Sequence, residues 1–135
     1  MVNDVLVYLI GIPITFLVIW QLIILKRSKA CIGKQAPDTT EVDGNSRENQ
    51  KLYFFHSLHC GPCKRVKPLV KELSQQYHNL IMIDVAEYPD LARSFGVLAA
   101  PTFIQVIDNK IVSANLGVQT EKWIREKLTV EQTGR

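Results

Sequence analysis

Two cysteines stand two residues apart in the stretch HCGPCK, residues 59–64. An apolar run at 52–55 precedes them and predicts a buried strand, and residues 64–77 have the spacing of a helix. Two cysteines at this spacing, at a strand-to-helix junction, are typical of thiol–disulfide exchange. With three cysteines in the chain, Cys60 and Cys63 make one unit and Cys31 is left over.

The predicted helix start would activate the first of the two thiols. A free cysteine is mostly protonated at neutral pH, but Cys60 would sit where unpaired backbone N–H groups and the helix dipole favour the thiolate. Pro62 suits the first helical turn, where no N–H is needed, and Gly61 leaves the approach to the sulfur open. Cys63, about one turn further in, could attack a mixed disulfide on Cys60 and release a reduced substrate.

Metal and haem binding are the competing explanations of the cysteine pair. Zinc needs four ligands, and the chain has no second cysteine pair. His56, His59 and Cys31 do not complete a recognised zinc spacing. Haem attachment would need a histidine directly after Cys63, where Lys64 stands. We therefore expect no metal and no cofactor.

The chain around this pair alternates strand-like and helix-like segments. The expected strands are 52–57, 80–85, 102–107 and 110–116, and the expected helices are 61–77, 89–95 and 120–130. Asp108-Asn109 fits a two-residue hairpin loop, Pro68 should kink the first helix and Gly96 can end the second. This order predicts an α/β fold, with a mixed sheet and helices on both faces.

An apolar segment near the N-terminus predicts a membrane anchor. Residues 5–25 contain no charge and would span about 31 Å as a helix, close to the ~30 Å of a bilayer core. A cleaved signal peptide is the alternative, but no Lys or Arg precedes Val5 and the apolar run is long for a signal core. Lys26, Arg27 and Lys29 also crowd the small residues that a signal peptidase would need.

The basic flank of this segment predicts its orientation. By the positive-inside rule, the lysines and arginine after residue 25 place the C-terminal domain in the cytoplasm, the periplasmic or extracellular side being the alternative. Three of the 16 basic residues and one of the 13 acidic residues lie in 1–29, which leaves the rest of the chain close to neutral. We therefore expect no nucleic-acid partner.

These features divide the chain into three parts. Residues 1–29 form the expected single-pass anchor, 30–50 a linker rich in turn-forming residues, and 51–135 the globular domain. Within the linker, at most 39–42 could make a short edge strand. Cys31 could carry a lipid as a juxtamembrane cysteine, although an incidental thiol is the simpler interpretation.

The motifs of the globular part resemble the thioredoxin family. The likeness lies in residues 55–68, with Cys-Gly-Pro-Cys at the centre and Pro68 five residues after the second cysteine, and in Ala100-Pro101-Thr102, Asn109-Lys110 and Gly117. It covers about residues 50–130 and implies a thioredoxin-like fold. It also implies that Cys60 attacks, that Cys63 resolves, and that the two form a redox-active disulfide beside a cis Pro101.

The resemblance further implies how substrate is bound. The backbone around Pro101 would hold an extended segment of a disulfide-containing protein next to Cys60, in the manner of an added strand. Ala100, Gly61 and Pro62 would complete this substrate-binding set. An upstream thiol reductant would be the second partner, and membrane lipid around residues 5–25 the third.

Three departures from the family pattern affect the chemistry. The family's Trp before the first cysteine is His59, its buried Asp is Phe54, and the partner Lys of that Asp falls near Leu80. The Asp assists proton transfer at the buried cysteine in the family, so the resolving step lacks that group here. His59 is a candidate to stabilise the Cys60 thiolate or relay protons, or is simply an exposed histidine, and His56 is expected to be packed rather than catalytic. The family's first strand and helix are expected to be absent or shortened.

These observations favour a membrane-anchored thiol–disulfide oxidoreductase that reduces protein disulfides, because Gly-Pro between the cysteines resembles the reducing members of the superfamily. One alternative is an extracytoplasmic reductase that serves the cysteines of cytochrome or metal-site maturation. Another is a thioredoxin-like binding module at a membrane complex, in which the dithiol is secondary. The intact cysteines and Pro101 weigh against the binding module.

Overall fold

A mixed β-sheet forms the centre of the domain. The computed structural model describes residues 1–44 and 47–129. Within these residues the sheet has four strands, β1 (Gln50–His56), β2 (Leu80–Asp84), β3 (Thr102–Ile107) and β4 (Lys110–Leu116), in the order β2-β1-β3-β4. β1 is parallel to β2, and the other two pairs are antiparallel. The predicted mixed sheet is confirmed.

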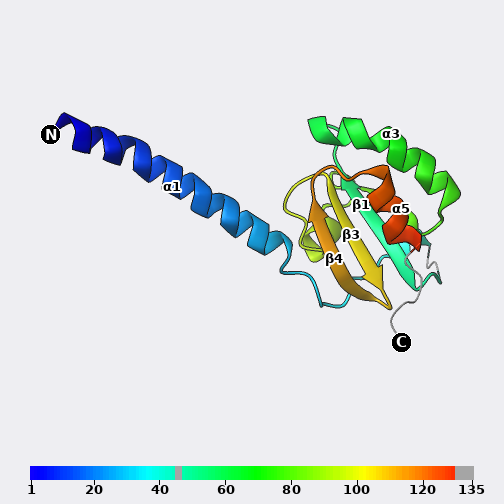
Figure 1. Cartoon of the computed structure of the whole chain (residues 1–135). Helices are drawn as coiled ribbons and strands as arrows, with labels where there is room; N and C mark the ends of the chain where they lie inside the picture. The colour runs from blue at the N-terminus through cyan, green and yellow to red at the C-terminus, as the bar shows by residue number, and fades with distance from the viewer. Residues whose placement is uncertain (45–46, 130–135) are drawn as a thin grey trace.

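Helices cover both faces of this sheet, as expected. The described chain contains α1 (Val2–Ser28), α2 (Thr40–Asp43), α3 (Gly61–Gln76), α4 (Pro89–Ser94) and α5 (Glu121–Thr129). Buried residues of α3 and α5 form one core with the sheet, and α2 and α4 contribute to the core on the other face. Figure 1 shows α1 as a long helix that extends away from this domain. Val130, which ended the expected last helix, lies outside the described residues.

The central strand β1 is apolar on both faces because both faces are covered. Leu52 and Phe54 belong to the core under α3 and α5, and Tyr53 and Phe55 to the opposite core. All four side chains are at most 1% exposed. Phe54 packs on Phe103 of β3, with ring centroids 4.7 Å apart. β1 is therefore a fixed platform for the loop that follows its last residue.

Local sequence signals end the elements where they were expected to. Asp108 and Asn109 have φ values of 50° and 62°, as a two-residue hairpin turn between β3 and β4 requires. Gly96 follows α4 with a φ of 73°, a conformation in which glycine carries no steric penalty. α3 continues on both sides of Pro68.

Part of the segment between α1 and β1, the expected linker, is hydrogen-bonded to the sheet. The N–H of Gly33 donates to the carbonyl of Ile111 at 2.7 Å, and the N–H of Ile111 donates to the carbonyl of Lys34 at 2.9 Å. The N–H of Ala36 donates to the carbonyl of Asn109 at 2.8 Å. These bonds pair residues 33–36 with the outer edge of β4. β4 is the last strand of the sheet in the described residues, so the backbone groups on this edge are not bonded to another strand and can pair with the segment.

Residues 39–42, where the sequence allowed at most a short edge strand, contain no strand. Residues 40–43 instead form the short helix α2. The turn that starts this helix is set by Asp38, whose Oδ1 accepts hydrogen bonds from the N–H and hydroxyl of Thr40. Gly44 ends it in the left-handed conformation, with φ 60°. The four-residue sequence Thr-Glu-Val-Asp is compatible with a helix or a strand, so the residues on either side of it determine that it forms a helix.

The N-terminal helix is long and apolar enough to cross a membrane. Within the described residues one helix passes this test, over Val2–Arg27, and its side chains are exposed outside the domain. A signal sequence near the N-terminus would pass the same test. Length and composition thus make α1 a candidate membrane span.

Candidate active site

Cys60 and Cys63 lie at the N-terminal end of α3, just beyond the C-terminal end of β1. Their Cα atoms are 5.2 Å apart and their sulfurs form a disulfide. Cys60 is the N-cap residue of α3, and its Sγ accepts a hydrogen bond from the backbone N–H of Cys63 at 3.2 Å. The first turn of the helix contains Pro62 and no acidic residue. This N-terminal position favours negative charge on the Cys60 sulfur.

The two cysteines differ in their access to solvent. Cys60 is partly exposed and is followed by exposed Gly61 and Pro62, whereas Cys63 is only 1% exposed. A disulfide of another protein can therefore reach the first sulfur and not the second. A two-step exchange needs this asymmetry, because the exposed sulfur must attack the substrate disulfide and the buried sulfur must then attack the mixed disulfide on Cys60.

A cis peptide bond joins Ala100 to Pro101, immediately before β3. Since Phe55 pairs with Thr102, Pro101 lies beside the end of β1, at the same edge of the sheet as the dithiol. Two hydrogen bonds fix this segment: the hydroxyl of Thr102 donates to the carbonyl of Ala99 at 2.6 Å, and the N–H of Gly117 donates to the carbonyl of Pro101 at 2.8 Å. Pro101 is buried and Ala100 is half-buried.

Comparison with known proteins identifies the fold family. The thioredoxin family profile matches residues 39–130. The chain belongs to the thioredoxin family. It is 34% identical over 92 residues to a thioredoxin of Staphylococcus haemolyticus, covering 66% of this chain and 88% of that protein. It is 33% identical to the mitochondrial thioredoxin-3 of Saccharomyces cerevisiae, covering 64% of this chain and 73% of that protein.

Solved thioredoxin structures agree with this assignment. A mutant thioredoxin from Halobacterium salinarum superposes with a TM-score of 0.59 at 29% identity, covering 70% of this chain and 84% of the other. The oxidised form of mitochondrial thioredoxin 3 from Saccharomyces cerevisiae gives a TM-score of 0.53 at 25% identity, covering 75% and 96%. Family and disulfide together support a thiol–disulfide oxidoreductase.

In this thioredoxin-family member, apolar residues of the core under α3 and α5 stand at two polar positions of the family pattern. Phe54, at the position of the family's buried Asp, is fully buried, and Leu80, near the position of its partner Lys, is 4% exposed. His59 is exposed directly before Cys60, and its role as a modulator stays a prediction. Cys31 is 6% exposed and packs beside Gly96 in the core, and burial raises the pKa of its thiol.

Sequence reasoning missed two exposed leucines near the dithiol. Leu58 is 64% exposed in the loop before Cys60, and Leu98 is 54% exposed in the loop before Pro101. Both loops end at the same edge of the sheet. Their signal in the sequence is weak, because a leucine in a loop next to a motif has no periodicity to distinguish it.

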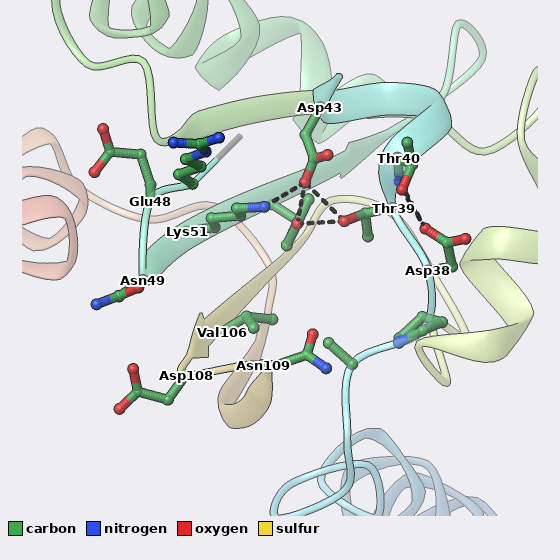
Figure 2. A pocket seen from close by; sticks show the side chains of 14 residues that line it. Asp38, Thr39, Thr40, Asp43, Glu48, Asn49, Lys51, Val106, Asp108 and Asn109 are labelled. Carbon is green, nitrogen blue, oxygen red and sulfur yellow. Dashed lines mark hydrogen bonds and ion pairs between the residues drawn. The ribbon is translucent and has the colours of Figure 1, made fainter. Parts of the chain in front are cut away.

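A polar pocket of about 540 Å³ lies at the opposite end of the sheet, where β1 begins and the β3–β4 hairpin turns. Figure 2 shows Lys51 of β1 reaching Asp43 of α2, with Thr39 beside them. The Asp43 carboxylate is 1% exposed and lies 2.7 Å from the Lys51 ammonium. It also accepts hydrogen bonds from the hydroxyls of Thr39 at 2.7 Å and Tyr53 at 2.9 Å.

This cluster fastens α2 to β1 and lies beside the pocket, at the end of the sheet opposite to the dithiol. Burial raises the pKa of Asp43, but the hydrogen bonds from Lys51, Thr39 and Tyr53 outweigh it and hold the pKa below its ordinary value. A carboxyl whose pKa is lowered on folding stabilises the fold above its unfolded pKa, about 4. This contribution is lost as the pH falls through the folded pKa.

Replacing Lys51 with methionine is expected to lower the free energy of unfolding by about 3 kcal/mol, because it removes the ammonium that faces a buried carboxylate. Urea denaturation of the full chain in detergent, followed by circular dichroism, measures the change. Lys122→Met, at an exposed position on α5, is the matched control. An equal effect of both variants would show that the cluster does not stabilise the domain.

Proposed function

We propose that this thioredoxin-family protein is a membrane-anchored enzyme that reduces disulfides of other proteins through Cys60 and Cys63. The observation that carries the proposal is the unequal pair at the start of α3. The accessible Cys60 sulfur receives a backbone N–H at the helix N-terminus, and Cys63 is buried directly behind it.

The exchange proceeds in two steps that transfer two electrons to the substrate. The Cys60 thiolate attacks one sulfur of the substrate disulfide, so that a mixed disulfide forms and the other substrate sulfur leaves and is protonated. Cys63 then loses its proton and attacks the Cys60 sulfur. The bond between Cys60 and the substrate breaks, and the Cys60–Cys63 disulfide forms. An upstream dithiol reductant reverses these steps on the enzyme and is itself oxidised.

The proposed substrate segment is extended and apolar. Backbone groups around Ala100 and Pro101 would hold it next to Cys60, with Gly61 and Pro62 on the other side. Exposed Leu58 and Leu98, in the loops that lead to Cys60 and Pro101, support apolar contacts with such a segment. An unfolded or loosely structured region of a protein offers both the extended backbone and the apolar side chains.

An insulin-reduction assay tests the activity. The full chain in detergent, supplied with dithiothreitol, is expected to accelerate the precipitation of insulin chains, and Cys60→Ser is expected to reduce the rate to that of dithiothreitol alone. Because Cys60 is the sulfur that solvent reaches, its loss removes the first step. If the unsubstituted chain also shows no acceleration, the domain acts as a binding module instead.

The proposed anchor is α1, with the domain in the cytoplasm. The apolar length of α1 supports the anchor, and Lys26, Arg27 and Lys29 on the domain side support the orientation. In intact reduced cells, a membrane-impermeant maleimide is expected to leave Cys60 unlabelled until the cells are permeabilised, with Cys60→Ser as the background. Labelling before permeabilisation would place the domain outside the cytoplasm.

A further inference from the structure

The histidine at the end of β1 is buried with an unsatisfied ring nitrogen. His56 is 6% exposed, and its Nδ1 is the one buried side-chain nitrogen or oxygen in the described chain that has no hydrogen-bond partner. A buried polar atom left in this way destabilises the fold, so it calls for a physical explanation. Packing of His56, which the sequence predicted, explains the burial of its side chain but not the missing hydrogen-bond partner of Nδ1.

The imidazole faces α3, the helix that starts at the dithiol. Residues two apart in a strand share a face, and Phe54 lies in the core under α3. The rings of Phe54 and His56 are stacked, with centroids 5.5 Å apart. His56 is thus the next side chain on that face toward the edge of the sheet where Cys60 and Cys63 lie.

The inner side of α3 above His56 carries Cys63. Cys63, Val66 and Val70 are buried on this side at helical spacing, and Cys63 belongs to the first turn. Lys67, one turn after Cys63, is close enough to act on the imidazole electrostatically. The last residue of β1 therefore lies on the α3 side of the sheet, at the end of the helix where Cys63 is buried.

We propose that His56 exchanges a proton with the Cys63 thiol during the resolving step, a role that rests on the proposed disulfide reduction. As Cys63 attacks, its S–H proton passes to Nδ1 of His56 and the Cys63–Cys60 bond forms. The bond from Cys60 to the substrate breaks, and the substrate sulfur leaves with the electron pair and takes a proton from solvent. The imidazolium then releases this proton to solvent, and when the dithiol is restored a proton from solvent passes through His56 to the Cys63 thiolate.

The oxidised state explains the unsatisfied nitrogen. Cys63 is in a disulfide in this structure and has no proton to donate. In the dithiol form, Cys63 S–H is the donor that Nδ1 lacks. The lone nitrogen is therefore a property of one redox state and not a packing defect.

Burial, together with a neighbouring lysine, favours the form of the imidazole that a proton acceptor needs. Burial lowers the pKa of His56, Lys67 on α3 lowers it further, and Asp84, its partner on β2, raises it in part. The net shift of the His56 pKa is downward, which favours the neutral imidazole, in which one ring nitrogen carries a lone pair that can accept a proton. Phe54 offers no acceptor on this face, and His59 is exposed on the loop.

The test separates the two half-reactions in the full chain in detergent. A fluorescent peptide disulfide reports formation of the mixed disulfide with Cys60 and then its resolution by Cys63, in single-turnover stopped-flow experiments. His56→Phe, which keeps an aromatic ring without a proton acceptor, is expected to slow resolution about 100-fold at neutral pH, the scale of general base catalysis. Its resolution rate should then rise steadily with pH as the thiol ionises unaided, while mixed-disulfide formation is unchanged.

His78→Gln is the matched control, because it removes an exposed imidazole beyond the far end of α3. Resolution by His56→Phe at the unsubstituted rate and pH profile would overturn the role of His56. Failure of the unsubstituted chain to form any mixed disulfide would instead overturn the proposed function. A second measurement needs no variant: the ¹⁵N resonance of His56 Nδ1 is expected to shift on reduction of the disulfide, and an unchanged resonance also overturns the proposal.

Discussion

Replacing Cys63 with serine is expected to stop the exchange halfway and leave the chain covalently bound to its substrate. Serine fills nearly the same volume at this buried position, so the fold and the Cys60 sulfur stay in place. A neutral hydroxyl does not attack the mixed disulfide, because the thiolate is the nucleophile of this reaction. With dithiothreitol present, insulin reduction should fall to the background rate. Without dithiothreitol, which would cleave the adduct, one peptide per chain should accumulate on Cys60, as measured by intact-mass spectrometry.

Two further variants make this result specific to the proposed order of attack. The double variant Cys60→Ser, Cys63→Ser is expected to trap nothing. Cys31→Ser in the trapping background is expected to change nothing, because Cys31 is buried in the core away from the dithiol edge. An adduct that maps to Cys31, or one that forms equally well without Cys60, would contradict the assignment.

Restoring the family's acidic residue at position 54 is expected to destabilise this protein by more than about 3 kcal/mol. Phe54 is fully buried against Phe103, and its surroundings include Leu52 and Leu80. The Phe54→Asp carboxylate would have no cation within this core and would lose the aromatic packing. Urea denaturation of the full chain in detergent measures the loss.

Phe54→Leu separates lost packing from buried charge, with an expected cost of about 1–2 kcal/mol. The new carboxyl would have its pKa raised by burial, so its penalty is present above the unfolded pKa of about 4 and fades below it. The difference in free energy of unfolding between Phe54→Asp and Phe54→Leu should therefore become smaller at acidic pH. Equal stability of the two variants at neutral pH would show that this core accepts a charge.

The strands and helices that position the dithiol could be predicted because their signals are local. The apolar run before Cys60 needs a strand covered on both faces, and Asp108-Asn109 specifies a tight hairpin turn. The pairing of 33–36 with β4 could not be predicted, since it joins irregular residues far apart in the chain. The missing hydrogen-bond partner of His56 Nδ1 could not be predicted from the sequence either, because the burial of a single atom depends on how α3 lies over β1.

The pairing of residues 33–36 with β4 limits how far the proposed anchored domain can travel. Cys31 is buried in the domain and Gly33 is hydrogen-bonded to Ile111. The connection between the end of α1 and the domain is therefore only a few residues long. With α1 in a membrane as proposed, the dithiol would search a thin layer beside the lipid surface and would meet partners by lateral diffusion in two dimensions. Disulfides that are themselves held at the same surface are thereby concentrated around the domain, whereas those in bulk solution are not.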